Sequence, residues 1–160
     1  MLNILVLCTG NSARSILAEA LLNARGDGRI SAFSAGSCPT GAPNPLALET
    51  LATHDLPTEG YRSKSWDEFA APDAPELDAV ITVCDSAAAE VCPVWPGAPV
   101  RAHWGLPDPA GIDDIDAARK AFVDTFRALD ARILALLDAL QGSDRIALQD
   151  AFDQIRHREF

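Results

Sequence analysis

The segment "CTGNSARS", from Cys8 to Ser15, combines the residue types that bind and attack an oxyanion. It follows the apolar run "LNILVL", which predicts a strand buried on both faces, and apolar residues recur at helical spacing after Arg14. Backbone N–H groups of a loop between such a strand and helix converge on one anion, aided by the helix dipole. Arg14 adds a bidentate guanidinium for a tetrahedral oxyanion. The segment, called the anion loop below, therefore predicts an anion-binding site.

Cys8 is the candidate nucleophile of the anion loop. The positive potential that binds an anion also favours the thiolate form of a cysteine, and we expect the Ser15 hydroxyl to donate to the sulfur. Gly10 permits the positive φ that such a loop needs, and Asn11 is the non-glycine residue that tolerates it best. The alternative is a buried structural cysteine before an ordinary strand–helix turn. Glycine, asparagine and serine in these places favour the chemical interpretation.

The composition excludes several classes of partner. The chain has 160 residues, which predicts a single domain, and 13 basic against 23 acidic residues give a formal charge of −10. We therefore expect no nucleic acid and no membrane as a partner, and any anion site must create its own positive potential. The first residues lack the features of a signal peptide and no stretch has the length of a membrane span, so the predicted location is cytoplasmic.

The cysteines are predicted to act as thiols. Without a secretion signal, a framework of structural disulfides is not expected for Cys8, Cys38, Cys84 and Cys92. Seven residues (85–91) separate Cys84 from Cys92, which does not fit a structural zinc site, so we expect no metal. Cys38, in "GSCPTG", is predicted to be a bystander.

Strand and helix patterns alternate along the chain, which predicts an α/β fold with a four-stranded parallel sheet flanked by helices. The expected strands are residues 2–7, 30–36, 77–84 and 99–104, and the expected helices begin at residues 14, 45 and 115, with a short helix over 66–69. Residues 1–142 form the expected domain, and 143–160 a C-terminal helical extension. Ligands bind at the carboxyl ends of parallel strands, where Cys8, residues 34–36 and Cys84 all lie.

Several motifs together resemble one family. "CTGNSARS" resembles the phosphate-binding loop of the low-molecular-weight tyrosine phosphatase fold, and most of all its arsenate reductase branch, where the loop typically reads C-T-G-N-S-C-R-S. The resemblance continues at "FSAG", "VCDSAAAEVCP" and "HWGLPDPAG", and so covers roughly Leu2 to Leu140. It implies that Cys8 is the nucleophile, Arg14 the oxyanion clamp, Ser15 the thiolate stabiliser and Asn11 the loop organiser. The implied oxyanion-binding residues are Thr9, Gly10, Asn11, Ser12, Ala13 and Arg14.

The resemblance also implies a general acid and a substrate class. In both branches the aspartate matching Asp108, in "LPDPA", protonates the leaving oxygen. Phosphatases of this fold usually carry an aromatic residue after the D-P pair, whereas this chain has Ala110. Its absence argues against an aryl phosphate and for a small inorganic oxyanion. His103 and Trp104 are expected to frame this acid loop.

A disulfide relay follows from the same resemblance. The family pattern assigns to Cys84 the attack on a Cys8–arsenate adduct, and to Cys92 the attack on Cys84 that leaves a Cys84–Cys92 disulfide. A helical segment would separate these Cα atoms by roughly 12 Å, whereas a disulfide needs about 4.4–6.8 Å, so we expect the segment to unwind on oxidation. The relatives usually have six intervening residues rather than seven. The alternative is that both cysteines are core residues.

Two further features depart from the relatives. Ala13 replaces their additional loop cysteine, so no thiol within the loop can resolve the Cys8 adduct. In some relatives a potassium ion lies on residues matching Asn11, Glu19 and Ser34, with an aspartate that Lys64 replaces here. The Lys64 ammonium either takes the place of the cation and pairs with Glu19, or is an ordinary solvated surface group.

The sequence thus predicts an arsenate reductase that makes arsenite without a bound cofactor. Its expected ligands are arsenate, with phosphate or sulfate as analogues, and an external thiol reductant, either thioredoxin with NADPH or glutaredoxin with glutathione. The alternative is a phosphatase of phosphotyrosine or small esters that uses Cys8, Arg14 and Asp108. A non-enzymatic anion sensor is the third possibility, which the complete set of catalytic residue types disfavours.

Overall fold

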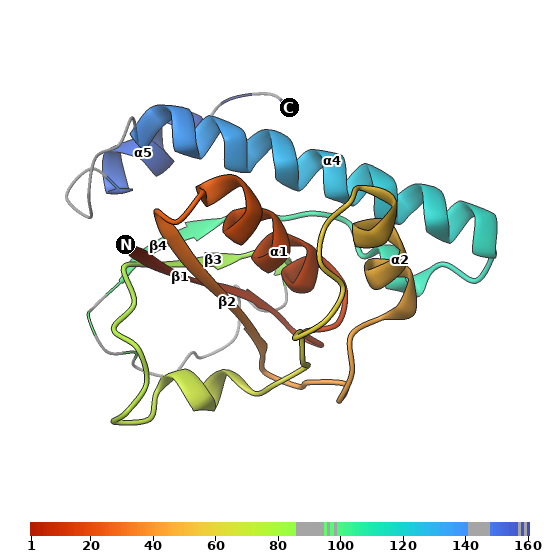
Figure 1. The fold of residues 1–160 in the computed structure, drawn as a ribbon, viewed down its shortest axis with the longest axis horizontal. Coiled ribbons are helices and arrows are strands. Elements are labelled where there is room, and N and C mark those ends of the chain that lie inside the picture. Colours follow the sequence, from red (N-terminus) through yellow and green to blue (C-terminus); the bar gives the residue numbers. More distant parts are fainter. Residues whose placement is uncertain (86–94, 96, 98, 141–147, 157, 159) are drawn as a thin grey trace.

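A four-stranded parallel sheet forms the centre of the molecule (Figure 1). The structure, a computed structural model, describes residues 1–85, 95, 97, 99–140, 148–156, 158 and 160. The strand order is β2-β1-β3-β4, with β1 at Leu2–Cys8, β2 at Ile30–Gly36, β3 at Ala79–Thr82 and β4 at Val100–His103. In register, Cys8 lies opposite Gly36 and Thr82 lies opposite both Leu7 and His103. The expected four-stranded parallel sheet is confirmed, although β3 is shorter than the expected 77–84, and Cys8 and Gly36 lie at its carboxyl edge.

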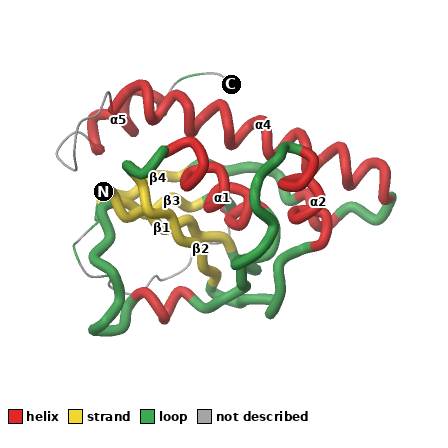
Figure 2. Tube along the Cα trace, viewed as in Figure 1, coloured by secondary structure: helices red, strands yellow, loops and turns green. Residues whose placement is uncertain are grey.

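The helices lie mainly on one face of this sheet (Figure 2). They are α1 at Arg14–Gly26, α2 at Pro45–Thr53, α4 at Ile115–Leu140 and α5 at Leu148–Ile155, with 3-10 helices η1 at Trp66–Phe69 and η2 at Pro109–Gly111. Figure 1 shows η1 on the side of the sheet opposite to α1 and α4. The helix starts expected at residues 14, 45 and 115 are confirmed, as is the short helix over 66–69. The helical turns expected around residues 86–91 lie outside the described residues.

The continuous apolar run of β1 serves two cores. Ile4 and Val6 belong to the larger cluster with α1 and α4, whereas Leu5 and Leu7 belong to a smaller cluster with Trp66 of η1. All four of these strand side chains are fully buried. Because successive side chains point to opposite faces, a strand covered on both sides must be apolar at every position.

The ends of the helices follow local rules. Asn44 caps α2 by accepting from the Leu46 N–H at 2.9 Å, and Pro45 occupies the first helical position as expected. α1 ends at Gly26, where the glycines 26 and 28 were expected to stop it, and the residues that follow, Asp27 with φ 47° and Gly28 with φ 80°, both have a positive φ. Gly26 also leaves room for Ile30, because a Cβ at residue 26 would lie 2.9 Å from Ile30 Cβ.

The C-terminal helix α5 packs on the larger core. Its buried residues form an apolar stripe of Leu148, Ala151, Phe152 and Ile155. The Phe152 ring contacts Trp104 edge-on, with centroids 6.1 Å apart. The expected helix stop at Gly142 and cap at Ser143 lie outside the described residues, and the division of the chain at residue 142 stays a prediction. No helix in the described ranges is both long and apolar enough to cross a bilayer.

We predict that Phe152→Ala lowers the free energy of unfolding by about 3–5 kcal/mol, because it leaves a cavity beside Trp104. Urea denaturation measures this change. Gln154→Ala, on the exposed face of α5, is the matched control and changes stability by less than about 0.5 kcal/mol. Equal stability of the two variants would show that α5 adds nothing to the core.

Candidate active site

The Cys8 sulfur lies at the centre of the anion loop. β1 ends at Cys8 and α1 begins at Arg14, so the loop lies at a helix N-terminus. The Asn11 N–H donates to Cys8 Sγ at 3.2 Å, and Ser15 Oγ lies 2.9 Å from the sulfur. Ser15 Oγ accepts from Asn11 Nδ2 at 2.8 Å, which leaves its own hydrogen free for the sulfur. The expected contact between Ser15 and Cys8 is therefore present, and the Asn11 contact lets the Ser15 hydroxyl donate to the buried sulfur.

Asn11, rather than Gly10, adopts the left-handed conformation of the loop. Its φ is 46°, whereas Gly10 is absent from the residues with positive φ. The expectation that Gly10 supplies the positive φ is therefore wrong for this position. A Cβ at Gly10 would lie 3.2 Å from Cγ2 of the exposed Thr40, whose side chain would have to shift slightly to admit it. Asn11 is fixed by its side chain, whose Oδ1 accepts from the Lys64 N–H at 2.9 Å.

The carbonyl groups of the loop are held by the segment that follows β2. The carbonyl of Thr9 accepts from Cys38 N at 2.9 Å, that of Gly10 from Thr40 N at 3.0 Å, and that of Ser12 from Asn44 N at 2.8 Å. In a trans peptide the N–H of the next residue points the opposite way. The N–H groups of residues 10, 11 and 13 consequently face away from this segment, as an oxyanion site requires. Cys38 contributes its backbone here, and its side chain is exposed.

Gly36 allows the loop to lie against the end of β2. A Cβ at this position would collide with the Thr9 carbonyl oxygen and lie 2.9 Å from that of Cys8. Both atoms belong to the backbone, so neither can rotate away. Only glycine therefore permits this approach of β2 to the anion loop.

Arg14 and Asp108 bring the acid loop to the anion loop. Arg14 Nη1 donates to the Leu106 carbonyl at 2.6 Å, and Nη2 lies 3.9 Å from Asp108 Oδ1. Asp108 also caps η2, since its Oδ1 accepts from the Ala110 N–H at 3.0 Å. The carboxylate is largely exposed whereas the guanidinium is mostly buried. This arrangement places an acid at the open side of the site and a cation beneath it.

Cys84 lies beside the anion loop. Its buried sulfur is 3.6 Å from Thr9 Oγ1, the hydroxyl of the residue that follows Cys8. Sequence reasoning placed Thr9 only among the oxyanion-binding residues and missed this contact, which no local pattern encodes. Cys92 lies outside the described residues.

A polar chain missed by sequence reasoning holds the residue after Cys84. Asp85 Oδ1 lies 2.8 Å from His103 Nε2, and His103 Nδ1 lies 2.7 Å from Thr82 Oγ1. Gly105 completes this packing, because a Cβ there would lie 2.8 Å from the Asp85 carboxylate. His103 was expected only to frame the acid loop. The signal in the sequence is the register of β3 with β4, which sets Thr82 opposite His103.

Glu19, Ser34 and Lys64 form a buried polar group behind the loop. Ser34 Oγ donates to Glu19 Oε2 at 2.8 Å, and Lys64 is only 9% exposed, so the solvated alternative for this lysine is wrong. Lys64 Nζ donates to the Arg62 carbonyl at 3.0 Å, and its positive charge interacts electrostatically with Glu19. Burial raises the pKa of Glu19, against the Ser34 hydrogen bond and the Lys64 charge. Burial lowers the pKa of Lys64, against the charge of Glu19.

Comparisons with known proteins place the chain in a family. Residues 3–145 match the low molecular weight phosphotyrosine protein phosphatase family. The chain belongs to this family. Arsenate reductase 1 of Bacillus cereus is 34% identical over 128 residues, which cover 74% of this chain and 92% of that protein. The arsenate reductase of Staphylococcus xylosus is 36% identical over 111 residues, 66% of this chain and 76% of its own length.

Solved structures of the phosphatase family share the fold. An arsenate reductase in its phosphate-binding state superposes with a TM-score of 0.71 at 25% identity, over 86% of this chain and 98% of that one. The thioredoxin-dependent arsenate reductase of Corynebacterium glutamicum gives 0.66 at 26% identity, over 90% of this chain and 64% of that one. The family match ends before α5 begins. The fold of the family thus extends over the site and leaves α5 outside the matched range.

We predict that Gly36→Ala weakens the binding of inorganic phosphate by about tenfold or more, because the added methyl group pushes the Thr9 and Cys8 carbonyls out of place. Isothermal titration calorimetry measures the affinity. Gly111→Ala is the matched control, since a Cβ there meets open space. Unchanged affinity in Gly36→Ala would mean that the loop tolerates the displacement.

The buried polar group predicts a pH dependence. The folded chain keeps the Glu19 proton at pH values where the unfolded chain, with a glutamate pKa near 4.5, has lost it, so stability falls as pH rises through this window. Lys64→Met removes a charge that lowers the pKa of Glu19 and so extends the window upward. We expect its free energy of unfolding to fall more steeply than that of the wild type between about pH 5 and pH 7 in urea titrations. Lys120→Met, at an exposed pair with Asp124, is the control, and parallel curves for Lys64→Met and wild type would contradict the coupling.

Proposed function

We propose that this protein reduces arsenate to arsenite through a relay of three thiols. The observation that carries the proposal is the contact between Cys84 and Thr9, because it puts a second thiol beside the loop that holds Cys8. A phosphatase needs only the Cys8 nucleophile, whereas reduction needs a thiol that attacks it. The relatives from Bacillus cereus and Staphylococcus xylosus, both named arsenate reductases, support the same choice.

In the first step, the anion loop and Arg14 bind arsenate, and the Cys8 thiolate attacks the arsenic atom. The Asn11 N–H and the Ser15 hydroxyl point at the sulfur and orient it for this attack. Asp108 protonates the departing oxygen, which leaves as water. A covalent Cys8–arsenate adduct remains, still with pentavalent arsenic.

In the second step, the Cys84 thiolate attacks Cys8 Sγ and forms a Cys8–Cys84 disulfide. The electron pair of the sulfur–arsenic bond stays with arsenic, which becomes trivalent and leaves as arsenite. Cys92 then attacks Cys84, releases Cys8 as a thiolate and leaves a Cys84–Cys92 disulfide. The two electrons given to arsenic are thereby transferred from the Cys84 and Cys92 thiols.

An external thiol reductant then restores the two thiols, and no bound cofactor takes part. The thioredoxin dependence named for the relative from Corynebacterium glutamicum favours thioredoxin with NADPH over glutaredoxin with glutathione. Such a system operates in the reducing cytoplasm, which we propose as the location. A Cys84–Cys92 disulfide requires the intervening segment to bring both Cα atoms within about 6.8 Å.

Phosphatase activity is the second candidate, because the family match covers Cys8, Arg14 and Asp108. The exposed Ala110 follows the D-P pair of the acid loop and offers no ring against which a phosphotyrosine could stack. We therefore expect only small, unspecific esters as phosphatase substrates.

Steady-state arsenate turnover with thioredoxin, thioredoxin reductase and NADPH tests the relay. We predict that Cys84→Ser and Cys92→Ser each lose turnover by about 10³-fold or more, because neither can regenerate Cys8. Cys38→Ser is the control, since Cys38 is exposed, and it keeps the wild-type rate. Wild-type turnover in both relay variants would refute the relay, and hydrolysis of p-nitrophenyl phosphate without arsenate turnover would establish the phosphatase instead.

A further inference from the structure

A cavity outside the anion loop gathers four arginines. Its volume is about 620 Å³, and none of residues 8–15 lines it. The lining cations are Arg101 of β4, Arg132 of α4, and Arg156 and Arg158 after α5. Among the described residues that line it, Asp153 is the one with an acidic side chain, which accepts from Gln149 Nε2 at 3.1 Å. We call this space the arginine cavity.

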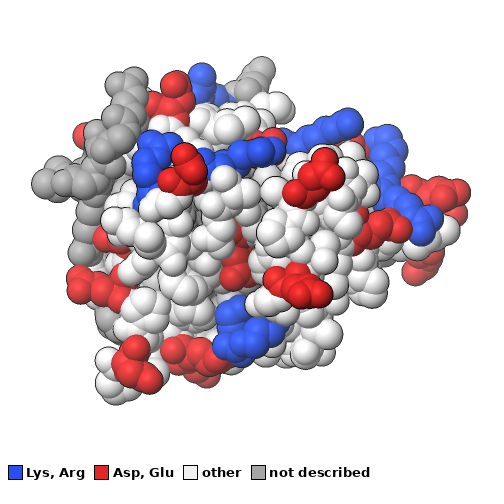
Figure 3. All heavy atoms as spheres, in the orientation of Figure 1, with Lys and Arg blue, Asp and Glu red and all other residues white. Residues whose placement is uncertain are grey.

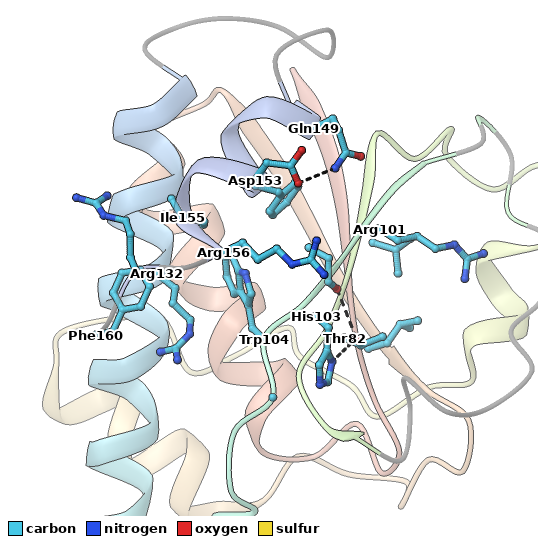
Figure 4. A pocket seen from close by; sticks show the side chains of 16 residues that line it. Thr82, Arg101, His103, Trp104, Arg132, Gln149, Asp153, Ile155, Arg156 and Phe160 are labelled. Carbon is cyan, nitrogen blue, oxygen red and sulfur yellow. Dashed lines mark hydrogen bonds between the residues drawn. The ribbon is translucent and has the colours of Figure 1, made fainter.

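These arginines lack carboxylate partners within the described residues. Elsewhere, Arg14, Arg25, Arg62 and Arg119 each pair with an aspartate or a glutamate. On the face shown in Figure 3, basic side chains lie beside acidic ones along α4. Arg101 lies 5.2 Å from the centroid of the Trp95 ring, and its guanidinium points away from the other lining side chains in Figure 4. In a chain with a formal charge of −10, the remaining arginines of the lining still form a local region of positive charge.

Arg132 and Arg156 approach the cavity from different elements. Figure 4 shows Arg156 reaching from the end of α5 across the cavity towards His103, whereas Arg132 lies against the ring of Phe160. The Arg132 guanidinium is 4.9 Å from that ring centroid and donates to the carbonyl of Ala128 at 3.0 Å. Burial lowers the pKa of Arg132, so its charge is partly desolvated, and no carboxylate of the described ranges pairs with it. An anion in the cavity would supply that counter-ion.

From this arrangement we infer that the arginine cavity binds a small organic anion with two or more acidic groups. Arg132 and Arg156 engage separate acidic groups of the ligand, and Trp104 and Phe152 form an apolar floor. The volume matches that of cavities that bind small molecules. Carboxylates and phosphates share the chemistry that guanidinium groups recognise, so the ligand is a polycarboxylate or a bisphosphate.

The arginine cavity is separate from the proposed catalytic site but lies next to it. α5 lies beyond the residues matched by the phosphatase family, so the wall that carries Arg156 is an addition to the family's fold. Another wall contains Thr82 and His103, which contact each other. His103 in turn contacts Asp85, the residue that follows Cys84. A ligand in this cavity would thus lie next to the strand end that carries the second thiol.

Calorimetric titration of the full chain with citrate and, separately, with fructose 1,6-bisphosphate tests the inference. We expect binding of at least one probe, weakened about tenfold in Arg156→Gln and in Arg132→Gln, because each loses a charge-assisted contact. Arg156 is exposed, so its variant folds even if that of Arg132 does not. Citrate binding identifies the polycarboxylate class, and bisphosphate binding the phosphate class.

Two controls separate this cavity from other anion sites. Arg119→Gln removes an exposed, paired arginine elsewhere and should bind the probes as the wild type does. Arg14→Gln disables the anion loop, so any probe binding that it retains belongs to the arginine cavity. The inference is overturned if neither probe binds at millimolar concentration, if Arg156→Gln binds like the wild type, or if Arg14→Gln alone abolishes binding. Because binding is measured without turnover, failure here leaves the arsenate reductase proposal untouched.

Discussion

The contacts of the buried Cys8 sulfur are the constraint on which the site depends. A thiolate in a buried place is costly unless donors surround it, and here the Asn11 N–H and the Ser15 hydroxyl supply them. Asn11 donates from the left-handed conformation, and its side chain is held in place because it accepts from the Lys64 N–H. The environment of the Cys8 sulfur therefore depends on segments that are distant in the sequence.

Backbone packing gives the anion loop its shape. Gly36 lets β2 approach the loop, and the segment after it takes up the outward carbonyls, so the N–H groups face inward. These donors and the mostly buried Arg14 create a positive site in a strongly acidic chain. An arsenate dianion is then attracted by local, preorganised dipoles rather than by the overall field. The same principle, with guanidinium groups in place of backbone dipoles, applies to the arginine cavity.

The spacing of apolar residues predicted the helices and strands well, because burial determines where apolar residues recur. The apolar run of β1, the stripe of residues 115–140 and the stripe of α5 each report directly on which face meets the core. The anion loop was also predictable, since its residue types and spacing state its chemistry. The sequence could not decide whether Gly10 or Asn11 adopts the positive φ of the loop. The space around Gly10 depends on Thr40, a residue distant in the sequence.

Contacts between distant segments could not be predicted. The burial of Lys64, the Thr9–Cys84 contact and the His103–Asp85 pair all depend on how strand ends meet in space. The most direct test of the central claim is disulfide mapping by mass spectrometry on Cys92→Ser after one exposure to arsenate. Our account predicts one arsenite released per chain and a disulfide that links Cys8 to Cys84. Release of arsenite without that disulfide, or a disulfide that links Cys8 to Cys38, would contradict it.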